Sequence, residues 1–262
     1  MTLVGKTLAG SYKDLLQVDN SNNGIDGNAR RIKDGEGTAS VISFSDDILA
    51  VQPVNDDTAA TFVVNNSAGD VLFFVNTTDT KVAALGNNLN TQYAHFGVTN
   101  GQSQAYVDDT HQAIPFNSAP YGAYLFPPSF GTSTDPATTF TTADGNGTRA
   151  GDLVPVVWFV PDAISIDSVT SFEGADNATG DTTRMHLFSY DFTSGSTSAL
   201  TGGTLLAHNS DVTNAGSEQS YKTSWTVDSA AVSSGKVILA FFRSDSINSD
   251  YSITITVKYH LT

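Results

Sequence analysis

Aspartate outnumbers glutamate by 24 to 3 in this chain of 262 residues, and the imbalance belongs to a wider bias. Ser, Thr, Asn, Asp and Gly supply 124 residues, whereas Glu, Lys and Arg supply only 15. Side chains of Ser, Asn and Asp compete for the backbone hydrogen bonds of a helix, and Thr is stiff at χ1. The composition therefore excludes a mainly helical fold and favours a chain of strands and turns.

The charge and cysteine content exclude several functions. The formal net charge is −15 at pH 7, which repels the phosphates of nucleic acids and of anionic membranes. No cysteine is present, so disulfide scaffolds, thiolate zinc sites and cysteine nucleophiles are excluded. The apolar runs, such as residues 156–160, are far shorter than the ~20 residues of a membrane span, and the start shows no secretory signal. We expect no nucleic-acid partner and no membrane insertion.

The first 40 residues are rich in turn-forming Gly, Asn and Asp and carry few apolar residues. Such a segment buries too little surface to offset its ordering entropy, so it needs a partner surface. Three of the 12 basic residues fall within four positions here, a pattern that fits a docking patch and a solvated loop equally well. We predict a docking segment over residues 1–40. Its candidate docking residues are Leu15, Leu16, Arg30, Arg31 and Lys33.

Residues 41–86 contain short apolar runs separated by turn residues, which predicts a meander of strands. A sheet of this length has little core, and its strand edges would be exposed. We therefore expect a β-stem that packs with further copies of the chain. The predicted strands are residues 41–44, 48–51, 61–64, 71–75 and 81–85.

The remaining chain divides into a linker and a domain. Residues 87–120 are polar and irregular, so they are expected to form a linker, with one short strand near residues 93–98. Residues 121–262 contain eight candidate strands with Gly-rich turns, which predicts a jelly-roll-like β-sandwich. The predicted strands are residues 123–126, 153–160, 163–171, 185–192, 204–207, 221–227, 236–242 and 251–261.

Two kinds of strand are recognisable in this domain. Residues 251–261 alternate apolar and polar side chains with a period of two, as a strand with one buried face does. Residues 153–160 and 237–242 are continuous apolar runs, which are typical of central strands covered on both sides.

No constellation of residues predicts catalysis. Three Asp pairs lie in polar turn contexts, whereas a catalytic carboxyl group needs an apolar pocket to raise its pKa. The five histidines lack metal-ligand spacing, and Walker, dinucleotide and nucleophile-elbow motifs do not occur. The Asp pairs are at positions 46–47, 56–57 and 108–109.

One loop matches part of the ligand spacing of a calcium-binding loop. Residues 144–152 place oxygen side chains as a calcium loop does, but Arg149 stands where the turn needs Gly and Pro155 where a Glu belongs. We expect no enzyme activity, no cofactor and no metal site.

Aromatic residues are numerous, with 15 Phe, 9 Tyr and 2 Trp. Trp158 lies in a continuous apolar run and is predicted to belong to the core. Trp225 shares a predicted strand face with Tyr221. Such a face either packs in a core or subunit interface or offers a sugar ring a stacking platform. Tyr221 and Trp225 are therefore the candidate ligand platform.

Two stretches resemble structural proteins of tailed bacteriophages, especially marine ones. The first is LAGSYKDLLQVDN at residues 8–20, followed by IKDGEG at 32–37 and SDDIL at 45–49, which resembles the start of such proteins. The second is FVVNNSAGDVLFFVNTTDTKV at residues 62–82, which is similar to the short β-repeats of trimeric phage fibres. The resemblance implies a homotrimer on the exterior of a phage particle, as a tail-fibre, head-fibre or decoration protein.

Together these expectations describe a non-enzymatic structural protein of a phage virion. Its N-terminal region would dock on capsid or tail proteins, and its sandwich would project outward. Many copies would add their contacts through effective concentration. The alternative is a carbohydrate- or host-receptor-binding module that recognises host surface glycans through Tyr221 and Trp225.

Overall fold

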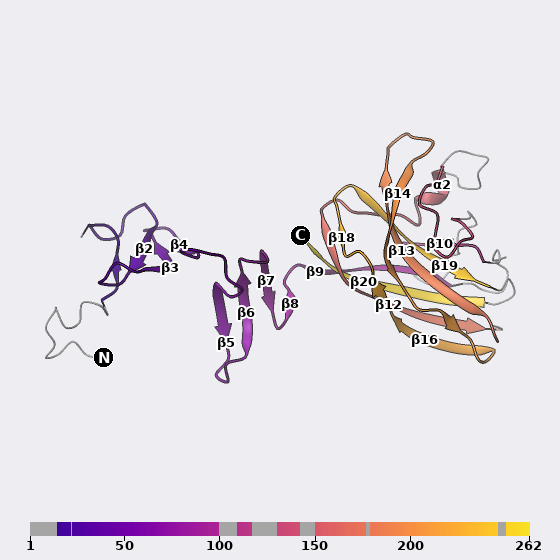
Figure 1. Cartoon of the computed structure of the whole chain (residues 1–262), viewed down its shortest axis with the longest axis horizontal. Coiled ribbons are helices and arrows are strands. Elements are labelled where there is room, and N and C mark those ends of the chain that lie inside the picture. The colour runs from indigo at the N-terminus through magenta and orange to yellow at the C-terminus, as the bar shows by residue number, and fades with distance from the viewer. Residues whose placement is uncertain are drawn as a thin grey trace. The chain divides into compact units, whose positions relative to one another are not determined.

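The computed structural model describes residues 15–21, 23–99, 109–116, 130–141, 150–176, 179–245 and 250–262. The chain separates into two compact units, Met1–Leu89 and Asn90–Thr262. Strands dominate both units, and all strand pairs in the described residues are antiparallel (Figure 1). The described residues contain one short helix, α2 (Ala150–Leu153). The prediction of an all-β fold is confirmed.

The first unit consists of two four-stranded sheets, β1 to β4 and β5 to β8, each with its strands in chain order. All five strands predicted between residues 41 and 86 are present, with ends that differ by at most two residues. The strands are β1 (Gln17–Val18), β2 (Arg30–Lys33), β3 (Ala39–Phe44), β4 (Leu49–Val51), β5 (Phe62–Asn65), β6 (Val71–Asn76), β7 (Lys81–Ala84) and β8 (Asn87–Asn88).

The predicted boundary between a docking segment and a stem at residue 40 is wrong, because β2 and β3 pair across it. The turn residues between them close a hairpin. The carboxylate of Asp34 accepts hydrogen bonds from the backbone N–H groups of Glu36 and Thr38, and Gly37 takes a positive φ of 88°. The turn residues look like part of an irregular loop in the sequence, but they join two strands of one sheet.

The second unit is a sandwich of a five-stranded and a seven-stranded sheet. The five-stranded sheet contains β9 (Thr91–Thr99), β12 (Ile164–Asp176), β16 (Glu218–Ser224), β18 (Ala231–Val232) and β20 (Asp250–Leu261). The seven-stranded sheet contains β10 (Gln112–Ile114), β11 (Trp158–Phe159), β13 (Thr182–Phe192), β14 (Leu200–His208), β15 (Val212–Thr213), β17 (Thr226–Val227) and β19 (Lys236–Ser244).

Eight main strands define the topology of the sandwich. One sheet has the strand order β9-β20-β12-β16, and the other has the order β10-β19-β13-β14. If the eight strands are numbered 1 to 8 along the chain, these orders are 1-8-3-6 and 2-7-4-5. Consecutive strands of this set therefore change sheet at every step except the β13–β14 hairpin. This order is that of a jelly roll, and the predicted jelly-roll-like sandwich is confirmed.

The predicted linker over residues 87–120 is wrong where the structure describes residues 91–99 and 112–114 as strands, and the second unit begins at Asn90 rather than at residue 121. Strand β9 pairs with β20 from Thr91 to Thr99, and β10 pairs with β19. Ala94, Phe96 and Val98 are buried on the inner face of β9. Of the two residues between them, His95 is exposed and Gly97 has no side chain, so the alternation is short and the segment looks irregular in the sequence. The short strand expected near residues 93–98 is the centre of β9.

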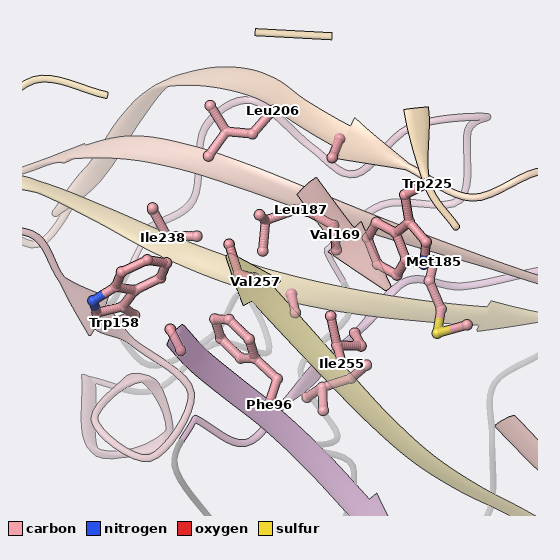
Figure 2. Close-up of a cluster of buried hydrophobic side chains, with 14 of the residues drawn as sticks. Phe96, Trp158, Val169, Met185, Leu187, Leu206, Trp225, Ile238, Ile255 and Val257 are labelled. Atoms are coloured by element: carbon pink, nitrogen blue, oxygen red, sulfur yellow. The ribbon is translucent and has the colours of Figure 1, made fainter. Parts of the chain in front are cut away.

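A hydrophobic core fills the space between the two sheets (Figure 2). Ile255 and Val257 of β20 point toward Leu187 of β13 and Ile238 of β19. The predicted alternation of the last strand is confirmed, because its inward residues from Tyr251 to Val257 are fully buried. Trp158 packs in the same core, stacked on Phe116 at a centroid distance of 5.8 Å, as predicted from its apolar run.

A second hydrophobic core covers the other face of the seven-stranded sheet. Residues 130–141 and 150–157 supply Phe130, Phe140, Leu153 and Val156, which pack against β13 and β19. Strand β19 is therefore covered on both sides, as its continuous apolar run predicts. The set of buried β19 residues is Val237, Ile238, Leu239, Ala240, Phe241 and Phe242.

The continuous strand predicted at residues 153–160 is wrong. Its first part ends α2 and forms a turn, in which Leu153 O accepts hydrogen bonds from the N–H groups of Val156 and Val157, and only Trp158 and Phe159 form a strand. Pro155 has no N–H to donate to a sheet, so a turn suits it better than a central strand. The strand predicted at residues 123–126 lies outside the described residues.

Candidate functional site

The basic cluster near the N-terminus is used inside its own sheet. The Arg30 guanidinium lies 2.9 Å from a carboxylate oxygen of Asp26 and lowers the pKa of that carboxyl group to about 2. The Lys33 ammonium lies 2.6 Å from a carboxylate oxygen of Asp19, across the β1–β2 pair. These ion pairs are partly exposed and each contributes little to stability.

Arg31 and the two leucines complete the predicted docking set. The Arg31 guanidinium donates to three backbone carbonyl groups and so joins β2 to the chain that follows β4. Leu15 is half-buried, and Leu16 is 75% exposed. Leu16 is therefore the member of the set that offers apolar surface to a partner. The carbonyl groups are those of Ser40, Gln52 and Pro53.

Apolar side chains occupy both faces of the sheet β5–β8. Residues paired across neighbouring strands share a face, and successive residues point to opposite faces. One face carries Phe62, Val64, Phe73, Val75, Val82 and Ala84. The opposite face carries Val63, Leu72, Phe74 and Ala83.

Very little of this apolar surface is buried. Among the described residues of the first unit, Ala83 is the one apolar side chain that is fully buried, whereas Phe62, Val63 and Val64 are each more than 40% exposed. A contiguous apolar surface of this kind marks an interaction site on a folded protein. The first unit therefore presents the most extensive candidate functional surface among the described residues.

The predicted ligand platform is wrong for Trp225. The ring is 7% exposed and packs in the core between the sheets, and its Nε1–H donates to Ser171 Oγ at 2.9 Å. The chain leaves β16 at this residue, which turns the indole inward instead of along the strand face. Tyr221 is half-buried at the sheet edge, and its hydroxyl donates to Gln219 Oε1 at 2.6 Å. The two aromatic rings form no shared exposed platform.

Two buried histidines contact each other at the end of the second core. Their ring centroids lie 4.9 Å apart in an edge-to-face arrangement. His186 Nε2 lies 3.2 Å from the Asp135 carboxylate, and His111 Nδ1 lies 3.2 Å from Gly131 O. His111 Nε2 and His186 Nδ1 have no hydrogen-bond partner among the described residues. Burial lowers the pKa of His111 to about 4 and that of His186 to about 3, so both rings are neutral at pH 7.

Glu173 is a carboxyl group inside the sandwich. It points inward from β12 and accepts a hydrogen bond from Thr183 Oγ1 at 2.7 Å, while Oε2 has no partner among the described residues. Burial raises its pKa to about 7. Sequence reasoning missed Glu173 and the histidine pair, because their partners lie on strands or loops that are distant in the chain. The period-two pattern of β12 is the one signal that places Glu173 on the inner face.

The other candidates for chemistry lie apart from one another. Asp46, Asp47, Asp56 and Asp57 are exposed in turns, and Asp109 pairs with Arg243. Most of the calcium-like loop 144–152 lies outside the described residues. In the part of the chain that the structure describes, no three His, Asp or Glu side chains are arranged to hold a metal ion.

Two open hollows lie on the second unit. One, of about 600 Å³, is mostly apolar and lies beside α2, where Val154, Phe159 and Phe192 are exposed. The other, of about 490 Å³, lies on the outer face of the five-stranded sheet around Phe172 and Gly174.

Comparisons with known proteins give no family for the chain. No protein-family model matches it, and no curated protein does. Among solved structures, it is similar to an aminopeptidase from the marine sediment archaeon Thaumarchaeota archaeon, at 8% identity and a TM-score of 0.33. The match covers 72% of this chain and 40% of that one, and a likeness this weak carries no argument about activity. Within the described residues, no helix has the length and apolar character of a membrane span.

Proposed function

We propose that the chain is a non-enzymatic structural protein of a phage virion, which forms a homotrimer through its first unit and presents the jelly roll outward. The observation that supports this proposal most directly is the sheet β5–β8, whose two faces are both apolar and both carry exposed side chains. Such a sheet gains stability only when other chains cover it.

Two different apolar faces favour a ring of copies. A two-fold dimer would use the same patch on both chains and cover one face of each sheet. When one face of each copy contacts a different face of the next, the contacts are heterologous, and they form a ring where the rotation between copies closes. Three copies are the smallest such ring, and this supports a trimer.

The N-terminal sheet is the part proposed to attach to capsid or tail proteins. Leu16 supplies exposed apolar surface there, while Arg30, Arg31 and Lys33 maintain the sheet. Jelly rolls occur in viral capsid proteins and in lectins, and either use suits an outward-facing domain.

Light scattering on the purified full chain tests the trimer. The expected mass is three times the chain mass of 27.6 kDa. Val64→Asp should give smaller species, because the added carboxylate would be buried between copies. In a monomer this position is 42% exposed and would tolerate Asp. Ser67→Asp, in the exposed turn of the same hairpin, is the control and should remain trimeric. A wild-type monomer at micromolar concentration would refute the stem.

Particle composition tests the location. Virions of a phage that encodes this chain should contain it by mass spectrometry, and an antibody against the second unit should label their exterior. A chain that is absent from purified particles, or that is present but not accessible to the antibody, would contradict the proposal.

A further inference from the structure

The outer face of the five-stranded sheet carries a phenyl ring that its neighbours leave uncovered. Phe172 points away from the core from the middle of β12 and is 59% exposed. Its in-register neighbours are Lys222 on β16 and Thr254 on β20. The exposed ring contributes little to folding through burial, and its apolar face is open to a ligand.

The ring stands beside a hollow whose floor is made of small residues. Gly174 is the next residue on the same face, and Ser220 and Ser252 flank it in register. A Cβ at Gly174 would meet Ser220 Oγ at 3.8 Å and Ser252 O at 3.9 Å, which are ordinary contacts, so the glycine keeps the floor of the hollow low without being forced by a close approach. The hydroxyl groups of Ser220, Ser252 and Thr254 make no hydrogen bond within the described part of the chain and are available to a ligand.

Lys222 differs from the other basic residues. Among the described Lys and Arg side chains, it is the one with neither an ion pair nor a hydrogen bond. In a chain with 27 acidic and 12 basic residues, an ammonium group without a partner is conspicuous. It lies directly beside the uncovered ring, on the rim of the hollow.

We propose that this hollow binds a pyranose sugar that carries a carboxylate, such as a uronic acid unit of an acidic polysaccharide. The apolar C–H face of the sugar packs on the ring of Phe172. The carboxylate accepts a charge-assisted hydrogen bond from Lys222, and the sugar hydroxyls bond to Ser220, Ser252 and Thr254. This site goes beyond the proposed virion function and does not depend on the trimer.

Calorimetric titration of the full chain at about 0.15 M salt, where charges more than ~8 Å from the ligand are largely screened, tests the ligand class. The probes are sodium D-glucuronate, D-glucose and tetragalacturonate. Glucuronate should bind about tenfold more tightly than glucose, which lacks the carboxylate. Tighter binding of tetragalacturonate than of glucuronate would assign a polymer as the natural source, and equal binding a single sugar unit. Equal binding of glucose and glucuronate, or no binding of any probe, would overturn the proposal.

Matched variants locate the site. Phe172→Ser and Lys222→Gln should each weaken glucuronate binding about tenfold. Tyr93→Ser and Lys258→Gln likewise remove an aromatic ring and an ammonium group from the same outer face, but away from the hollow, and should leave binding unchanged. Unchanged tryptophan fluorescence melts would show that all four variants fold. Full binding by Phe172→Ser, or equal losses in its Tyr93→Ser control, would place the sugar elsewhere and overturn the assignment.

Discussion

The imidazole rings of His111 and His186 lie edge to face with their centroids 4.9 Å apart, both buried beneath residues 130–137. The two rings come from segments 75 positions apart in the chain, and each ring has one nitrogen without a hydrogen-bond partner in the described residues. The arrangement is compatible with two neutral rings, because a charge on either would lie unsolvated beside its neighbour. The charged or titratable groups around the pair are Asp135, Arg184, His208 and Arg243.

The histidine pair should make the second unit sensitive to acid. Each histidine of the unfolded chain binds a proton near pH 6.5, whereas burial lowers the pKa to about 4 at His111 and to about 3 at His186 in the folded chain. Stability should therefore fall as the pH decreases from 6.5 to 3, by a few kcal/mol. Melts followed by tryptophan fluorescence report this unit, because Trp158 and Trp225 both lie in it.

The double variant His111→Gln, His186→Gln should show a flatter dependence of melting temperature on pH over this range. His95→Gln is the control, because this ring lies on the outer face of β9 and is exposed. If the acid sensitivity persists unchanged in the double variant, other titratable groups cause it.

Glu173 should have the opposite pH dependence. Its pKa is raised to about 7 in the folded chain, against 4.5 when solvated, so the folded state stays protonated up to a higher pH than the unfolded state. Stability from the neutral carboxyl group is then complete below pH 4.5 and is lost as the pH rises through 7. At pH 8, Glu173→Gln should stabilise the folded chain by about 1–3 kcal/mol and so raise its melting temperature. At pH 4.5 it should change the melting temperature little. A similar effect at both pH values would mean that ionisation is not the cause.

The last strand should tolerate charge on one face only. Ile255 is fully buried between the sheets, so Ile255→Asp should destabilise the second unit by about 3–5 kcal/mol. Thr254, its neighbour, points outward, and Thr254→Asp should cost less than about 1 kcal/mol. Fluorescence melts of the two full-length variants give the comparison. Equal losses would mean that another chain covers the outer face.

Gly203 should be required for a close backbone contact. Its N–H donates to Thr138 O at 2.9 Å, and a Cβ at this position would lie 2.7 Å from Thr138 Cα and 2.6 Å from Tyr190 Cε1. Gly203→Ala should therefore destabilise the second core by about 1–3 kcal/mol. Gly216→Ala is the matched control, since its Cβ would meet only ordinary contacts at 3.7 Å. Equal melting temperatures for the two variants would contradict the contact.

Local sequence patterns were sufficient for much of the secondary structure. The scarcity of helix formers predicted the all-β class, the short apolar runs predicted β3 to β7, and the alternation from residue 251 predicted β20. The same patterns misplaced the start of the second unit at residue 121. The outer face of β9 carries Tyr93, His95 and Gly97, which share no common character, so the segment resembles a linker until β20 pairs with it.

Composition by itself determined the fold class, and periodicity determined the inward face of individual strands. Both signals can be read from residues that are close together in the chain. The tertiary structure decided which residues share a site. It turned Trp225 into the core, paired Arg30 and Lys33 with acids of their own sheet, and placed Phe172 beside Lys222. These outcomes depend on strand register between segments that are far apart in the chain, and register is set by the burial of whole faces rather than by any local pattern.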